Sequence, residues 1–202
     1  MTTLAYRSLI GWILTLMLAL GKASGEGQEI EAVTVTQRGE IRVERSEGRL
    51  DEPLRLVGGD FVVRRVVVSP NGAEVVILVA DVTHLDWASR VFAFDPKTAT
   101  LRVVYDTFAD RWNGPHYLLD AAKEAGRPEN RYPDNDLEDL FYDAKGVLHV
   151  VNEDNDTFAL DQKAGVVVGL RLVREVALVA GPKVEETEVA GERAFRVRLP
   201  SR

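Results

Sequence analysis

The sequence predicts an all-β fold built from antiparallel hairpins, on two observations. Runs rich in valine and other apolar residues alternate with short turns that contain Pro, Asn, Asp and Gly, the residues that set the backbone angles of tight turns. Four of these turns carry a glycine between two strand-like runs, at Gly39, Gly72, Gly146 and Gly191. The repetition indicates that one device is used along the whole chain.

Two stretches repeat this device twice in succession. In the first, FVVRRVVV and EVVILVAD flank the turn SPNG at 69–72, and a second hairpin turns at DPKT, 95–98. In the second, the turn DAKG at 143–146 precedes the turn DQKAG at 161–165. Residues 61–105 and 138–172 therefore each read as strand, glycine turn, strand, loop, strand, aspartate turn, strand.

A four-stranded unit of about 40 residues is the period of a β-propeller blade. VVVSPNGAEVVILVAD followed by RVFAFDPKTATLRVV resembles a blade of the bacterial β-propeller repeat proteins, whose turns read Ser-Pro-Asp-Gly and Asp-x-x-Thr-Gly; FYDAKGVLHVVNEDNDTFALDQKAG resembles their Asp-x-x-Gly blades. This chain departs from the pattern at Asn71 and Ala99. The resemblance implies a small or incomplete propeller-like array of antiparallel four-stranded sheets. A β-sandwich is the alternative, since it uses the same hairpins.

The longest interruption of the strand pattern is residues 107–139. Pro115 suits the first turn of a helix, Gly126 suits its end, and an apolar stripe lies between them. One short inserted helix is therefore expected. Long insertions in compact domains tend to be lids or binding loops, although a structural plug over one end of the sheet would look the same.

The first residues form a separate segment. Arg7 precedes an apolar run from Leu9 to Leu20, and small residues follow it, as in a secretory signal peptide. We expect cleavage near Ala23, which leaves residues 24–202 as a single domain; an uncleaved anchor is the alternative. The chain contains no cysteine, so it has no lipoprotein anchor and no disulfide. A periplasmic or extracellular protein held together by its core is expected.

The charge balance excludes one class of partner. The chain has 25 basic and 32 acidic residues. Removal of residues 1–23 takes away two basic residues, Arg7 and Lys22, which leaves 23 against 32, a formal charge of −9. Binding of nucleic acid requires clustered Lys and Arg, so neither nucleic acid nor an anionic membrane is expected as a partner after cleavage.

Two sets of residues are candidate sites. Aromatic and imidazole side chains that line ligand pockets are expected to converge at one end of the sheets: His84, Trp87, Trp112 and His116. Carboxylates that could supply oxygen ligands to calcium lie in and after the insertion: Asp134, Asp136, Asp139 and Asp154. Their spacing does not fit an EF-hand, and a solvated acidic turn is the alternative. His149, inside VLHVV, reads as a core or channel residue.

The sequence favours a binding module that contacts a protein or small ligand through the 107–139 loop. A calcium-dependent hydrolase similar to lactonase propellers is the second hypothesis, and it rests on likeness of fold. Open sheet edges also allow a homo-oligomer, or a larger propeller completed by another chain.

Overall fold

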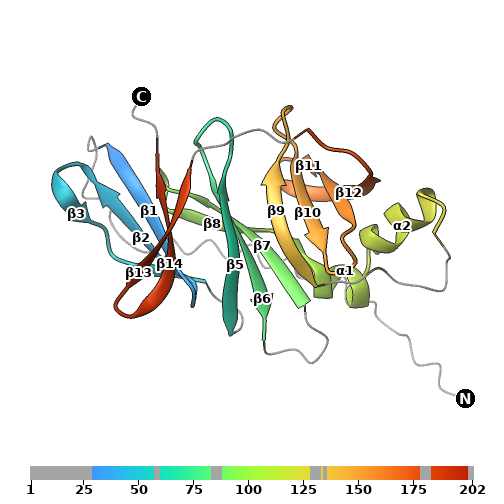
Figure 1. The fold of residues 1–202 in the computed structure, drawn as a ribbon, viewed down its shortest axis with the longest axis horizontal. Helices are drawn as coiled ribbons and strands as arrows, with labels where there is room; N and C mark the ends of the chain where they lie inside the picture. The colour runs from blue at the N-terminus through green and yellow to red at the C-terminus, as the bar shows by residue number, and fades with distance from the viewer. Residues whose placement is uncertain are drawn as a thin grey trace, which may run out of the picture.

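The described part of the chain is mostly β-strand. The computed structural model describes residues 29–56, 60–82, 88–127, 133, 136–177 and 183–199. Their strands form three antiparallel sheets that follow one another along the molecule (Figure 1). The prediction of an all-β fold with antiparallel four-stranded sheets is confirmed. The expected signal peptide lies outside the described residues, so it stays a prediction, and no described helix has the length and apolar character needed to cross a membrane.

The two predicted four-stranded units form one sheet each. The middle sheet contains β5 (Phe61–Val68), β6 (Val75–Asp81), β7 (Ala88–Asp95) and β8 (Thr100–Asp106), in that order. The distal sheet contains β9 (Leu137–Tyr142), β10 (Leu148–Asn152), β11 (Thr157–Lys163) and β12 (Val166–Val173). Gly72 and Gly146 have φ of 67° and 77°, the left-handed geometry that glycine adopts without strain.

The first and last strands of the described chain share the terminal sheet. This sheet contains β13 (Val184–Val189), β14 (Glu192–Arg198), β1 (Ile30–Thr36), β2 (Glu40–Arg45) and β3 (Arg49–Leu50), in that order, and β4 (Leu54–Arg55) also pairs with β2. A 3-10 turn, Ser46–Gly48, precedes β3. Pairing of β1 with β14 runs from Ala32 opposite Arg198 to Thr36 opposite Ala194. The hairpins at Gly39 and Gly191 are thus joined edge to edge.

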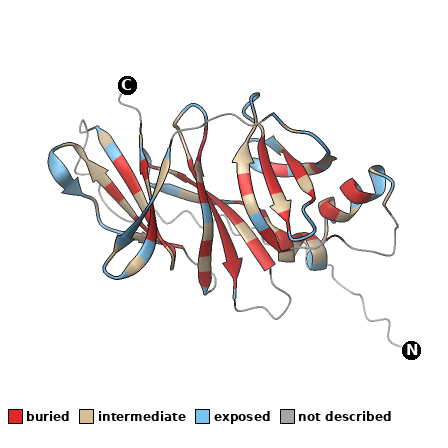
Figure 2. Ribbon diagram, viewed as in Figure 1, coloured by how far each residue is buried: buried red, intermediate tan, exposed pale blue. Residues whose placement is uncertain are grey.

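The middle sheet is covered on both faces. Every residue of β6 is buried (Figure 2). Val75, Ile77 and Val79 belong to a core shared with the terminal sheet, whereas Val76 and Leu78 belong to one shared with the distal sheet. A strand with two buried faces requires a continuous apolar run rather than alternation, which explains the sequence VVILVAD. A two-layer sandwich would leave one of these faces uncovered.

The sheets stack in the same order of strands. β9 packs against β5, so the first strands of the distal and middle sheets are in contact. β12 packs against β8, so their last strands are in contact as well. β13, the first strand of the terminal sheet, also contacts β5. This is the blade-like succession that the sequence predicts, with three sheets in the described part of the chain.

The insertion contains two short helices where the sequence predicts one. α2 (Tyr117–Glu124) buries Leu118, Ala121 and Ala122, as expected, and it packs against β12. α1 (Thr107–Asn113) is an additional helix at the start of the insertion, where the sequence predicts no regular element. The side chain of Asp106 caps α1 by accepting a hydrogen bond from Ala109 N.

Candidate functional site

One end of the molecule gathers the segments that follow β8 and β10. Ser89, at the start of β7, bonds to Thr107, directly after β8, and to Leu137, at the start of β9, so the same ends of the middle and distal sheets lie together. Glu153 N, after β10, donates to Asp136 O, just before β9, at 3.1 Å. Arg127, after α2, forms an ion pair with Asp156, before β11. We call this end of the molecule the loop end.

Asp110 of α1 organises the insertion at the loop end. Its side chain is buried, and one carboxylate oxygen, Oδ2, accepts hydrogen bonds from Tyr105 Oη (2.9 Å) and Leu118 N (3.1 Å). The other oxygen, Oδ1, accepts from Tyr117 N at 2.7 Å, and the backbone carbonyl accepts from His116 N at 3.2 Å. One residue thus fixes the start of α2 to α1 and to β8, because it satisfies amides that a helix start leaves without partners.

The last residues of α1 and the turn that leads to α2 are presented to solvent. We call residues 111–116 the exposed turn. Trp112 is 53% exposed, and the guanidinium of Arg111 lies 4.9 Å from the centre of its ring, a cation–π geometry. His116 is exposed and has a φ of 65°, uncommon for a residue other than glycine. A Cβ at Gly114 would have His116 Nε2 as its nearest neighbour, at 3.7 Å, so the imidazole lies beside Gly114.

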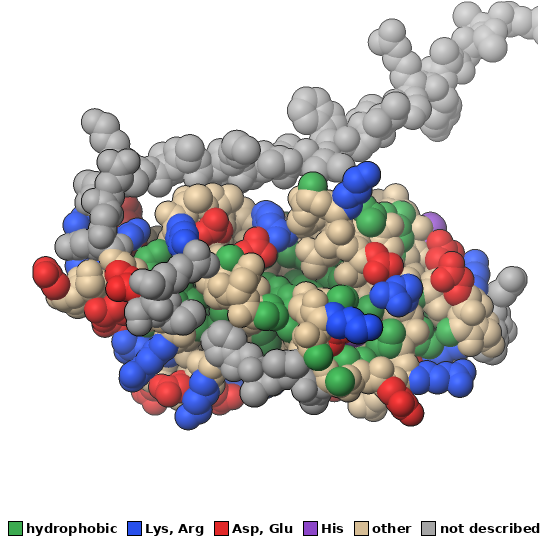
Figure 3. All heavy atoms as spheres, turned by 90° about the horizontal axis from the view of Figure 1, so that it is seen from above, with side chains coloured by type: hydrophobic (Ala, Val, Ile, Leu, Met, Phe, Trp, Pro, Cys, Tyr) green, Lys and Arg blue, Asp and Glu red, His purple; other side chains and the backbone are tan. Residues whose placement is uncertain are grey.

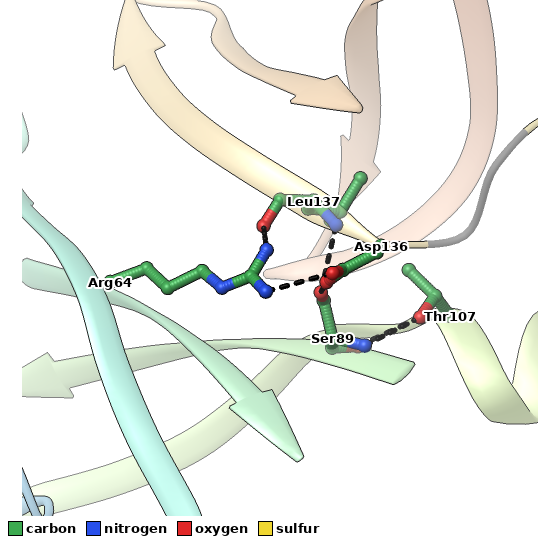
Figure 4. A network of polar contacts seen from close by, with 5 residues as sticks. All are labelled: Arg64, Ser89, Thr107, Asp136 and Leu137. Carbon is green, nitrogen blue, oxygen red and sulfur yellow. Dashed lines mark hydrogen bonds and ion pairs between the residues drawn. The ribbon is translucent and has the colours of Figure 1, made fainter. Parts of the chain in front are cut away.

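A second polar network joins the middle and distal sheets (Figure 4). Arg64 of β5 donates to Asp136 Oδ2 at 2.7 Å and to Leu137 O at 2.9 Å. Ser89 Oγ donates to Asp136 Oδ1 and accepts from Leu137 N, at 2.9 and 2.8 Å. Ser89 N in turn donates to Thr107 Oγ1 at 2.8 Å. The buried carboxylate of Asp136 therefore fixes the start of β9 to the middle sheet through its bonds to Arg64 and Ser89.

The structure brings together part of the first predicted site, whereas the described carboxylates of the second have separate surroundings. Trp112 and His116 lie on the same turn, whereas His84 and Trp87 lie outside the described residues. Of the carboxylates, Asp136 is buried in the network above, Asp139 pairs with Arg65 at 3.0 Å, Asp154 is exposed in the loop after β10, and Asp134 lies outside the described residues. Within the described ranges, no three His, Asp or Glu side chains are placed to hold a metal ion.

His149 is buried, as a core position requires. Its ring stacks on Phe141, with centroids 5.1 Å apart, and Nε2 lies 3.2 Å from Asp143 Oδ2. The pKa of Asp143 is lowered, chiefly because its carboxylate accepts a hydrogen bond from Val147 N and also because His149 and Lys145 N contact it. These contacts brace the β9–β10 turn.

The residues that organise these networks beside Asp136 were not predicted from the sequence: Arg64, Ser89 and Asp110. Arg64 and Ser89 lie in strands that are otherwise mostly apolar, each beside another arginine, and their partner Asp136 is far along the chain. No sequence motif identifies Asp110, because its side-chain partners lie in other elements, Tyr105 in β8 and Tyr117 and Leu118 at the start of α2.

Comparison with known proteins adds a distant likeness to solved structures. No protein-family model and no curated protein matches the chain. Among solved structures, a Bacteroides fragilis NCTC 9343 protein whose assignment as a 6-phosphogluconolactonase is provisional aligns at 14% identity with a TM-score of 0.38. The alignment covers 73% of this chain and 35% of that one, so it spans about a third of the other protein's length.

Proposed function

We propose that the protein is an exported binding module that contacts a partner protein through the exposed turn, residues 111–116. The observation that carries this proposal is the Asp110 network, which holds both ends of the turn while Trp112 remains in solvent. Export rests on the signal-peptide pattern of residues 1–23.

The chemistry of the exposed turn suits recognition of a protein. Tryptophan and arginine are enriched among the residues that dominate binding energy at protein interfaces, and here Arg111 is stacked on Trp112. Asp110 holds the two ends of the turn together, which limits the conformational entropy that binding would cost. Loops held by a rigid scaffold carry binding functions more often than the scaffold does.

Charge supports a protein partner over a polyanion. Acidic residues outnumber basic ones in the chain. On the face seen in Figure 3, basic and acidic side chains of the described residues are interspersed around apolar ones, without a continuous basic patch. Binding to phosphate backbones depends on such patches.

Site-specific photo-crosslinking tests the proposal. A benzoylphenylalanine is placed at Asn113 in the exposed turn or, as a matched control, at Lys97, which is exposed in the turn between β7 and β8. Each protein is irradiated in an extract of the source cells, and adducts are identified by mass spectrometry. We expect one dominant protein adduct from position 113 and none of that mass from position 97.

Competition completes the test. An excess of unlabelled protein should abolish the adduct, whereas an equal excess of the Trp112→Ala variant with an unchanged circular dichroism spectrum should not. Absence of a specific adduct at 113, or equal competition by both proteins, would refute the proposal. A homo-oligomer through open sheet edges stays a separate prediction, and the mass of the protein in solution tests it.

A further inference from the structure

The chain contains two Asn-Gly pairs, Asn71-Gly72 and Asn113-Gly114. At such a pair, the amide nitrogen of the glycine can attack Cγ of the asparagine side chain. An N–Cγ bond forms, the Cγ–Nδ2 bond breaks, and the side-chain nitrogen leaves as ammonia, with the backbone proton completing it. Water then opens the resulting five-membered imide to aspartate or isoaspartate. The two pairs have the same reacting atoms, so their surroundings decide which one reacts.

Asn71 is held away from this reaction. Its Oδ1 accepts hydrogen bonds from Ser69 Oγ at 2.8 Å and from Ala73 N at 3.0 Å. The nucleophile itself, Gly72 N, donates to Ser69 O at 2.8 Å. Attack therefore requires three hydrogen bonds of a tight turn to break together.

Asn113 lacks these restraints. It is exposed and is the last residue of α1, a helix of seven residues. Its side chain makes no hydrogen bond with any residue that the structure describes. Terminal residues of short helices leave the helical conformation readily, and the glycine that follows has no Cβ to hinder approach to the asparagine side chain.

We propose that Asn113 is a site of spontaneous deamidation and that Asn71 is protected from it. The asymmetry follows from the hydrogen bonds above and does not depend on the proposed function. Its consequence does rest on that function: conversion places a new carboxylate, or an isoaspartate with an extra backbone methylene, beside Trp112 in the exposed turn. The reaction would thus produce two forms of the protein, one with asparagine and one with aspartate or isoaspartate at position 113, that differ at the proposed binding surface.

The experiment follows both pairs in the same molecule. The folded full chain is incubated at 37 °C and mildly alkaline pH, and peptides that contain each pair are quantified by mass spectrometry over several weeks. We expect Asn113 to convert at least about fivefold faster than Asn71. The Ser69→Ala variant, which removes one donor to Asn71 Oδ1, should raise the rate at Asn71 and leave the rate at Asn113 unchanged.

A denatured control separates structure from sequence. In concentrated urea the difference between the two rates should shrink markedly. Equal rates in the folded protein, faster conversion at Asn71, or an unchanged ratio in urea would overturn the proposal. None of these outcomes bears on the crosslinking test, so the two proposals can fail independently.

Discussion

Arg64 Nη2 lies 2.7 Å from Asp136 Oδ2, and this ion pair fastens the distal sheet to the middle sheet. The Asp136 side chain is only 2% exposed. Removing one member of a buried pair leaves the other charge without compensation and costs about 3–5 kcal/mol. We expect Arg64→Ala to lower the free energy of unfolding by about 3 kcal/mol, measured by urea denaturation.

The neighbouring arginine provides the control for that prediction. Arg65 pairs with Asp139, but both side chains are about half exposed, at 51% and 46%. An exposed pair contributes between about 0 and 1 kcal/mol, so Arg65→Ala should change stability by less than that. Similar losses in the two variants would show that the Asp136 network does not fasten the sheets.

Asp110→Ala should destabilise α2 more than it destabilises the sheets. The substitution removes the acceptor for Tyr105 Oη and for the amides of Tyr117 and Leu118, and each unsatisfied buried donor costs about 1–3 kcal/mol. Hydrogen exchange measured by mass spectrometry should show faster exchange in residues 117–124 and unchanged protection in β6. Asp120→Ala, at an exposed position of α2, is the control and should leave exchange as it is.

Gly39→Ala and Gly191→Ala should differ, although both glycines have a φ of 80°. The left-handed conformation costs alanine about 1–2 kcal/mol at either position. At Gly39, the new Cβ would also lie 2.9 Å from Leu56 Cδ1, whereas nothing lies within 4 Å at Gly191. Thermal and urea denaturation should therefore show the larger loss for Gly39→Ala, and equal losses would mean that Leu56 moves aside freely.

Tyr142 should make the protein sensitive to alkali. Burial, with the charge of Glu74, raises the pKa of its hydroxyl to about 12, whereas an unfolded tyrosine titrates near 10. The folded state keeps the hydroxyl proton to a higher pH than the unfolded state does. The free energy of unfolding therefore has its full value below about pH 10 and falls as pH rises from about 10 to 12. Tyr142→Phe should remove about 2 kcal/mol of the alkaline loss. An identical alkaline slope in the variant would contradict this assignment.

Turn chemistry made the hairpins predictable. At 69–72, proline, asparagine and glycine specify the turn locally, and the strands on either side follow from their apolar runs. Ala99, where the resembled family has glycine, also adopts a positive φ, of 52°, so the turn geometry persists without the preferred residue. The sequence thus contained the two four-stranded units and the four glycine turns.

Long-range pairing was not predictable in the same way. Asp136 was expected among metal-ligating carboxylates because it lies in an acidic stretch, yet its partner Arg64 is 72 residues away. Nothing local distinguishes a carboxylate that faces solvent from one that meets an arginine of another sheet. α1 was missed in part for this reason, since contacts of Asp110 with the start of α2 hold its end, although the Asp106 cap at its start is local.

The pairing of β1 with β14 sets the order in which the protein can be completed. Of the described strands, β1 and β2 are synthesised first, but β1 lacks a partner on its other side until β14 has been made. The free edge of β1, which contains the core residues Val33 and Val35, therefore stays unpaired while the strands of the middle and distal sheets are synthesised. A circular permutant in which a short linker joins β14 to β1 should therefore fold faster, because the β1–β14 pairing becomes local.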